Sequence, residues 1–303
     1  MKNNINDKFD NFEEEKTCLK ILLVSDTHNN KYYLDMLEDK LKLENKKFDI
    51  IIHSGDFGNV NNESESKKPT EEDRSNGIKD VKTCLNMLVN YSLNNRVYYI
   101  LGNHEPEDLF DINCNNKIIS DTRFVYLDRL IYETEYNINL IGISGSIPTI
   151  LLEDNYENTN KDKFISLGYP YTGSSYKEAD MLYGNTIKEL LVNNKKKELN
   201  NQFIFVTHSG PFGLTTFKYQ ENGSHRMGSY TLLNQLLEEK KLLFSIHGHF
   251  HSSQGRISLG NKNKGKFIIN PGGIVYGHYA ELEITRNSIS EDWYLSNTEF
   301  YNL

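Results

Sequence analysis

The sequence predicts an α/β protein whose strands carry polar residues to one edge of a sheet. Five short apolar runs rich in β-forming residues are typical of buried strands. Segments with helical spacing of Leu, Ile and Met lie between several of them. Each of the five runs passes directly into Asp, His or Asn, and in α/β sheets the ligand crevice lies beyond the carboxyl ends of the strands. The pattern therefore predicts a polar site at that edge.

The expected elements alternate along most of the chain. The five strands with polar ends are expected within residues 19–26, 48–56, 96–105, 202–211 and 242–251. Helices are expected at residues 32–44, 74–91, 175–194 and 229–241. Further strands are expected at residues 123–128, 129–135, 138–145, 265–273, 279–285 and 291–296.

The domain organisation is read from polar stretches without periodicity. Residues 1–17 form a polar N-terminal arm, and residues 18–303 form a single domain. Two polar insertions interrupt that domain, near residues 59–75 and 152–175.

Charge and cysteine usage exclude several classes of protein. The net charge of -8 opposes a broad nucleic-acid-binding face, so a nucleic-acid partner is not expected. The chain has three cysteines, an odd number with no CxxC pair, which favours reduced thiols over disulfides; they are Cys18, Cys84 and Cys114. The first residues contain no apolar stretch, and no segment reaches the length of a membrane span. A soluble, cytoplasmic protein without a membrane partner is the expectation.

The residues at the strand ends form the candidate site. They are Asp26, His28, Asp56, Asn103, His104, Glu105, His208, His249 and His251. The spacing of Asp26-x-His28 and of His249-x-His251 puts both side chains of each pair on one side of an extended backbone. Carboxylate, imidazole and amide groups without thiolates suit Mn, Fe, Zn or Ni, and do not make a structural zinc site. Two such ions, bridged by a carboxylate about 3.5–4 Å apart, are suited to phosphoester hydrolysis.

The motifs D-x-H, G-D, G-N-H-E, a lone His and G-H-x-H, in that order, resemble the calcineurin-like metallophosphoesterase superfamily. The resemblance spans about residues 19 to 286 and is nearest to the small phosphodiesterase and phosphatase branch. It implies a four-layer αββα sandwich with a dinuclear metal site at the edge formed by the strand carboxyl ends. It also implies that 270–273, "NPGG", is a structural turn.

The resemblance further implies a role for each strand-end residue. One metal would be held by Asp26, His28, Asp56 and His251, and the second by Asp56, Asn103, His208 and His249. Asp56 would bridge two divalent ions, of which Mn is favoured, and a metal-bridging hydroxide would be the nucleophile. His104 would be a catalytic group that hydrogen-bonds or protonates the substrate, and Glu105 would support the local geometry.

Several alternatives remain open at this stage. The strand-end residues could be caps and turns, or the fold could persist as a catalytically silent scaffold. His225 and Arg226, in a Gly- and Ser-rich loop, line the substrate pocket or belong to an ordinary exposed loop. His53 and His247 flank the motif strands and are expected to point away from the site.

The substrate class is narrowed by missing arginines. Protein Ser/Thr phosphatases of the superfamily carry G-D-x-x-D-R-G and an Arg before G-N-H-E, whereas this chain has "GDFGNV" and "YILGNHE". The expected substrate is a small-molecule or nucleotide phosphodiester; a phosphomonoesterase or protein phosphatase is the alternative. Loops at 59–72, 152–175 and 212–229 are expected to set specificity.

Overall fold

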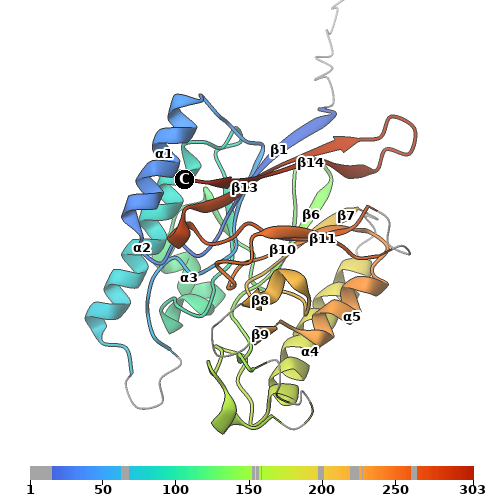
Figure 1. Ribbon diagram of the computed structural model, residues 1–303. Coiled ribbons are helices and arrows are strands. Elements are labelled where there is room, and N and C mark those ends of the chain that lie inside the picture. Colours follow the sequence, from blue (N-terminus) through green and yellow to red (C-terminus); the bar gives the residue numbers. More distant parts are fainter. Residues whose placement is uncertain are drawn as a thin grey trace, which may run out of the picture.

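Two sheets packed face to face, with helices on both outer faces, form the protein (Figure 1). The computed structural model describes residues 16–62, 68–151, 154, 157, 159–196, 201–218, 225–226, 228–260 and 265–303. Figure 1 shows α1, α2 and α3 against one sheet, and α4 and α5 against the other. These four layers confirm the predicted αββα sandwich.

The first sheet has six strands, with a parallel centre and an antiparallel edge. In spatial order they are β14 (Trp293–Asn302), β13 (His278–Arg286), β1 (Cys18–Val24), β2 (Ile50–His53), β3 (Val97–Tyr99) and β4 (Phe124–Tyr126). Because β1, β2 and β3 are parallel, their carboxyl ends lie along one edge.

The second sheet also has six strands. In spatial order they are β11 (Gly255–Ser258), β12 (Phe267–Asn270), β10 (Leu242–His247), β7 (Gln202–Thr207), β6 (Ile138–Ile143) and β5 (Ile131–Glu133). The strands β6, β7, β10 and β12 are parallel, while β5 and β11 are antiparallel edges. A separate hairpin pairs β8 (Phe217–Lys218) with β9 (His225–Arg226).

Strand β1 shows why four layers form. Its last four residues, 21–24, are buried on both faces, so this part of the sequence is a continuous apolar run rather than an alternating one. Leu22 and Val24 pack into the core beneath the helices of the first sheet. Ile21 and Leu23, on the opposite face, pack into the core between the two sheets.

Within the described residues, five α-helices cover the sheets, and four of them lie where the sequence predicts. They are α1 (Lys31–Leu43), α2 (Glu71–Val89), α3 (Ile112–Ile119), α4 (Tyr176–Lys196) and α5 (Tyr230–Glu238). Helix α3 is the one that sequence analysis missed, since its eight residues are too few for a clear periodicity.

Helix α2 begins earlier than the sequence predicts. The sequence predicts the helix from residue 74 and places residues 71–73 in a polar insertion, but Glu71 is the first helical residue. Thr70 and Asp73 form a reciprocal capping box, which uses the polar residues that obscured the helix start.

The polar arm and the insertions are described only in part. Residues 1–15, 63–67 and most of 152–158 lie outside the described residues. Within the arm, Thr17 accepts a backbone hydrogen bond from Arg286, and Lys16 pairs with Asp49. The described remainder of the second insertion contains η2 (Lys161–Lys163) and bridges back to the segment after β6, at Ser146 and Thr149. Among the described helices, none combines the length and apolar character needed to span a bilayer.

Candidate metal centre

The carboxyl ends of strands from both sheets meet at one edge, and the predicted ligands lie there. Asp26 follows β1 and Asp56 follows β2, while His208 follows β7 and His249 follows β10. The backbone N–H of His249 donates to both carboxylate oxygens of Asp26, at 3.0 and 3.1 Å. This contact joins the two sheets directly at the site.

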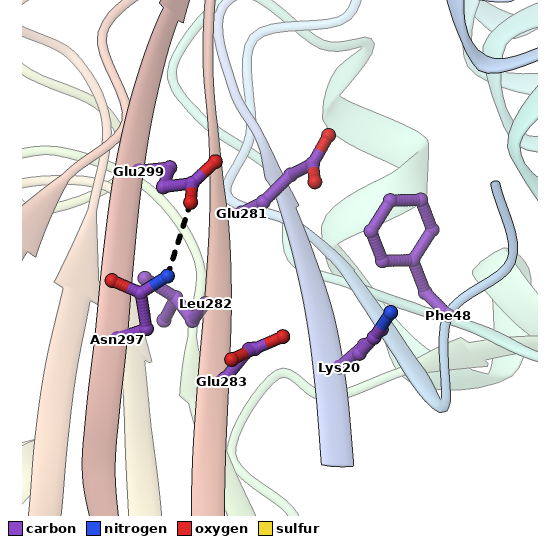
Figure 2. Close-up of a pocket in the computed structure, with 7 residues that line it drawn as sticks. All are labelled: Lys20, Phe48, Glu281, Leu282, Glu283, Asn297 and Glu299. Carbon is purple, nitrogen blue, oxygen red and sulfur yellow. Dashed lines mark hydrogen bonds between the residues drawn. The ribbon is translucent and has the colours of Figure 1, made fainter. Parts of the chain in front are cut away.

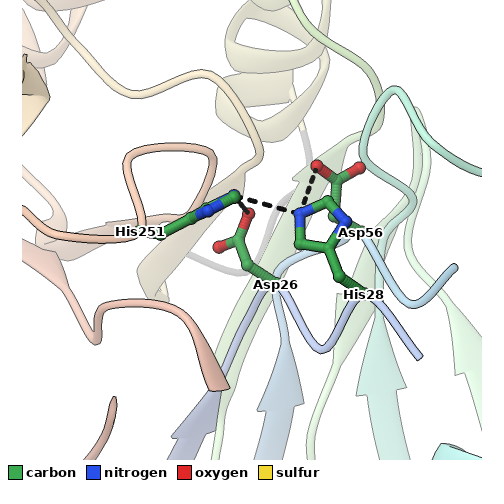
Figure 3. A group of neighbouring side chains, drawn as sticks. All are labelled: Asp26, His28, Asp56 and His251. Carbon is green, nitrogen blue, oxygen red and sulfur yellow. Dashed lines mark hydrogen bonds and ion pairs between the residues drawn. The ribbon is translucent and has the colours of Figure 1, made fainter. Parts of the chain in front are cut away.

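The first cluster consists of Asp26, His28, Asp56 and His251, each of which offers one ligand atom within 4.8 Å of the others (Figure 3). The Nε2 atoms of His28 and His251 are 3.0 Å apart. Nε2 of His251 lies 3.2 Å from Oδ1 of Asp26, and Nε2 of His28 lies 3.5 Å from Oδ2 of Asp56.

The second cluster consists of Asp56, His208 and His249, and it shares Asp56 with the first. Nε2 of His208 is 3.1 Å from Oδ2 of Asp56. Nδ1 of His249 is 3.2 Å from the same His208 nitrogen. Asn103, the remaining predicted ligand, is buried beside this cluster, and its backbone N–H donates to Oδ1 of Asp56 at 2.9 Å.

The donor set fits divalent ions. Two ligands bound to one ion at about 2.1 Å, with an angle of about 90–110°, lie about 3.0–3.4 Å apart, which is close to the separations within each cluster. His208 presents Nδ1 to the carbonyl oxygen of Ser54 at 2.8 Å, and His28 presents Nδ1 to that of Gly58 at 3.1 Å. These contacts fix each ring with Nε2 toward the cluster, as is usual for metal-ligating histidines.

Four of the clustered residues adopt a left-handed backbone conformation, which is uncommon for residues other than glycine. The φ angles are 51° for Asp26, 45° for His28, 57° for Asp56 and 69° for His249. Each such conformation costs on the order of 1 kcal/mol and concentrates at functional sites. The strand ends therefore turn sharply so that these side chains face one another.

Two glycines leave room for the carboxylates. A Cβ at Gly102 would lie 2.1 Å from Oδ1 of Asp56. A Cβ at Gly248 would lie 2.0 Å from Oγ of Ser25 and 2.7 Å from Oδ2 of Asp26. The glycines of the G-N-H-E and G-H-x-H motifs thus permit the close approach of Asp56 and Asp26.

Asp56 and Glu105 connect the loops after β2 and β3. Oδ1 of Asp56 accepts backbone hydrogen bonds from Asn103 and His104, at 2.9 and 3.0 Å. The buried carboxylate of Glu105 accepts from the backbone N–H groups of Gly102, at 2.6 Å, and of Phe57. Burial, reinforced by the charge of Asp56, raises the pKa of Glu105 to about 8.

The electrostatics keep the two central aspartates ionised. Burial alone raises the pKa of Asp56, but the charges of His208 and His104 hold it well below its usual range. Burial also raises the pKa of Asp26, but the charge and hydrogen bond of His251 hold that pKa below its usual range. Burial and the charge of His208 lower the pKa of His249 to about 3. Burial lowers the pKa of His208, but the charge and hydrogen bond of Asp56 raise it to about 9, so this imidazole would release a proton on binding an ion, whereas the aspartates are already in the ionised form that binds metal.

His104 lies beside the clusters and belongs to neither. Its ring centroid is 5.2 Å from that of His28, and its Nδ1 is 3.2 Å from the carbonyl oxygen of Val60. The half-buried ring is therefore held at the border of the site.

Two other histidines lie close to the site without joining a cluster, and the side chain of a third is not described. His53 stacks on Phe57 with centroids 3.6 Å apart, and Nε2 of His247 is 2.9 Å from Oγ1 of Thr215, so neither joins a cluster. The backbone of His225 and Arg226 forms β9, but their side chains lie outside the described part of the chain.

Two asparagines that sequence analysis missed position the site. Oδ1 of Asn59 lies 3.0 Å from Nδ1 of His28, and its amide donates to the backbone oxygen of His28 at 2.8 Å. Asn62 donates to the backbone oxygens of Asn103, at 3.1 Å, and Glu105. Both lie at the start of the polar stretch that the sequence predicts to be an insertion, and no periodicity marks them.

Two hollows in the described part of the chain have no cluster residue in their lining. A cavity of about 480 Å³ between α1 and α2 is bordered by Thr27, Phe57, Asp80 and Cys84 among others. A smaller hollow of about 60 Å³ crosses the outer face of β1, β13 and β14 (Figure 2). Figure 2 shows Lys20 and three glutamates lining it, with Asn297 bonded to Glu299. It is too small for more than a few waters.

Sequence comparison decides the family. The sequence profile of the calcineurin-like phosphoesterases matches residues 19–253. The chain belongs to this family. As a member it is a hydrolase that acts on phosphoester bonds, and the buried carboxylate and imidazole clusters are suited to the divalent metals that the family binds. No curated protein matches the sequence.

Solved structures support the fold. A crystal structure of TT1561 of Thermus thermophilus has 11% identity and a TM-score of 0.53, and the alignment covers 94% of this chain and 99% of that one. The phosphopantetheinyl hydrolase PptH of Mycobacterium tuberculosis has 11% identity and a TM-score of 0.53, over 91% of this chain and 95% of that one. A further crystal structure has 16% identity and a TM-score of 0.62, with 94% and 99% covered. At these identities the similarity bears on the fold alone.

Proposed function

We propose that this phosphoesterase uses two divalent ions, with Mn favoured, to hydrolyse a small-molecule or nucleotide phosphodiester. The first ion is assigned to the first cluster and the second to Asp56, Asn103, His208 and His249. The observation that carries this proposal is that Asp56 belongs to both clusters, because one carboxylate can bridge two ions. When bound, the ions would neutralise charge on the phosphoryl group and lower the pKa of a water.

The chain's own residues would orient the substrate and move a proton. Nδ1 of His104 donates to the carbonyl oxygen of Val60, which leaves Nε2 as the nitrogen that would deliver a proton. That proton would pass to the leaving oxygen as the ester bond breaks. Asn59 and Asn62 would keep the loops of His28 and His104 in place through the hydrogen bonds described above.

A diester is favoured over a phosphoprotein substrate by the two motifs that lack arginine. Arg side chains grip phosphate through bidentate hydrogen bonds, and "GDFGNV" and "YILGNHE" provide none at the positions used by the protein phosphatases. The site edge is rich in carboxylates, and no nucleic-acid partner is proposed. The three cysteines are free thiols, which is consistent with the proposed cytoplasmic location.

The test compares bis-p-nitrophenyl phosphate with p-nitrophenyl phosphate, after Mn is added to metal-stripped protein. The expected result is metal-restored turnover of the diester that is lost in Asp56→Asn and retained in Asp35→Asn, which alters an exposed carboxylate on α1. A preference for the monoester would favour the phosphatase alternative. A folded, metal-loaded protein without turnover of either ester would favour the scaffold.

A further inference from the structure

We propose that Tyr276 is a stacking surface for a planar aromatic group of the substrate, which makes nucleotides and aryl phosphoesters the preferred class. This inference rests on the proposed function of the same site. Tyr276 ends η5 (Ile274–Tyr276), and its ring centroid is 5.9 Å from that of His251. The residue is 53% exposed although it adjoins a buried cluster.

Tyr276 borders the side from which substrate reaches the first cluster. The side chain of His251 is 28% exposed, whereas those of Asp26 and Asp56 are at most 1% exposed and that of His28 is 9% exposed. Solvent therefore reaches the cluster at His251. A phosphoryl group held there would project its ester substituents past His251 and over the Tyr276 ring.

The turn that carries Tyr276 is fixed to the site by backbone hydrogen bonds. The N–H groups of Ile274 and Val275 donate to the carbonyl oxygens of Ser25 and Asp26, at 2.9 and 3.0 Å. Gly273 N–H donates to the carbonyl oxygen of His251 at 3.0 Å. These bonds come from the strand ends that supply the ligands, so the turn and the ligands form one rigid unit.

Helix α1 supports the turn from the other side. Asn30, its N-cap, donates to the carbonyl oxygen of Val275 at 3.3 Å. The ring of Tyr33 lies so close to Gly277 that a Cβ there would be 2.9 Å from it. A tyrosine on a fixed turn has only two side-chain torsions to order when a ligand stacks on its ring, so the loss of conformational entropy is small.

The ring suits a planar group better than an aliphatic one. Stacking of a base on an aromatic side chain is worth about 1–3 kcal/mol and tolerates any base, because every base has a π-face. Tyr276 also lies near the ring of His278, at 6.4 Å between centroids, which widens the aromatic border. A substituent without a ring would gain none of this contact.

The test uses AMP and ribose 5-phosphate, which share the ribose and phosphate and differ only in the base. Their Kd values are measured by calorimetry on the Mn-loaded full chain. Wild type is expected to bind AMP more tightly, and Tyr276→Ala to weaken AMP binding about 5- to 150-fold while leaving ribose 5-phosphate unchanged. Tyr276→Phe is expected to keep the affinity for AMP, since the ring remains.

Tyr294→Ala is the matched control, because Tyr294 is 46% exposed on β14 and should affect neither ligand. Equal loss of both ligands in Tyr276→Ala, or no tighter binding of AMP than of ribose 5-phosphate by wild type, would overturn the inference. Binding is read without turnover, so this result is independent of the diester assay. A wild type that binds AMP through Tyr276 but hydrolyses no diester would overturn the proposed reaction alone.

Discussion

Replacing Gly102 by alanine should disrupt the metal centre through a single displaced carboxylate. The new Cβ would lie 2.1 Å from Oδ1 of Asp56, whereas real Cβ contacts are not shorter than 3.0 Å, so the oxygen must move by 3.0 − 2.1 = 0.9 Å. Moving that oxygen away breaks its hydrogen bonds from Asn103 and His104, now 2.9 and 3.0 Å long. Each bond to a charged group contributes about 1.5–3 kcal/mol, so the loss is at least about 3 kcal/mol.

The consequences are measurable in two assays. Thermal unfolding should show a Tm about 5–10 °C lower, because about 3 kcal/mol shifts the Tm of a large domain by that amount. Titration of metal-stripped protein with Mn should show affinity reduced at least about 100-fold, since Asp56 belongs to both clusters. Gly255→Ala is the control, because a Cβ there meets nothing within 4 Å. A Gly102→Ala protein with wild-type Tm and wild-type Mn binding would refute this reasoning.

Three further changes test other parts of the molecule. His104→Ala should lower kcat about 10²- to 10⁴-fold at unchanged Mn content, because His104 lies outside both clusters; metal analysis showing a lost ion would contradict this role. Burial raises the pKa of Asp80 to about 6, above its usual 3.8. Between about pH 4 and 6 the folded chain therefore keeps a proton that the unfolded chain releases, so the free energy of unfolding falls as the pH rises through this range. Asp80→Asn should remove that fall and raise the free energy of unfolding at pH 7 by about 1 kcal/mol after solvent screening. Denaturant titrations of both proteins at pH 4 and 7 measure this, and a substitution effect that is the same at both pH values would disprove it. Thr70→Ala should lower the free energy of unfolding by about 1 kcal/mol by removing the capping box, and an unchanged urea midpoint would argue against it.

The strands and long helices were predictable because their signals are local. The apolar runs ending at Val24 and His247 are long enough to be strands buried on both faces, and the polar residues that follow them mark the strand ends. Helix α3 and the first turn of α2 were not predicted. Their apolar residues are too few for a period, and their polar caps resemble loop residues in the sequence.

The sequence by itself determined the residue types of the site and the order of the motifs. It predicted that Asp26, Asp56 and His251 would converge, because residues at the carboxyl ends of parallel strands share an edge. That inference needs only the strand pattern, which is encoded within a few residues of each ligand.

Only the tertiary structure decided the contacts between segments that are distant in sequence. Asn59 holds His28 across 31 residues, and the turn before Tyr276 bonds to Asp26 across about 250 residues. Neither contact has a local signature in the sequence, because single asparagines and tyrosines are also common in exposed loops without any such contact. The packing of two sheets against each other brings these side chains to the metal site, and that packing depends on the whole core.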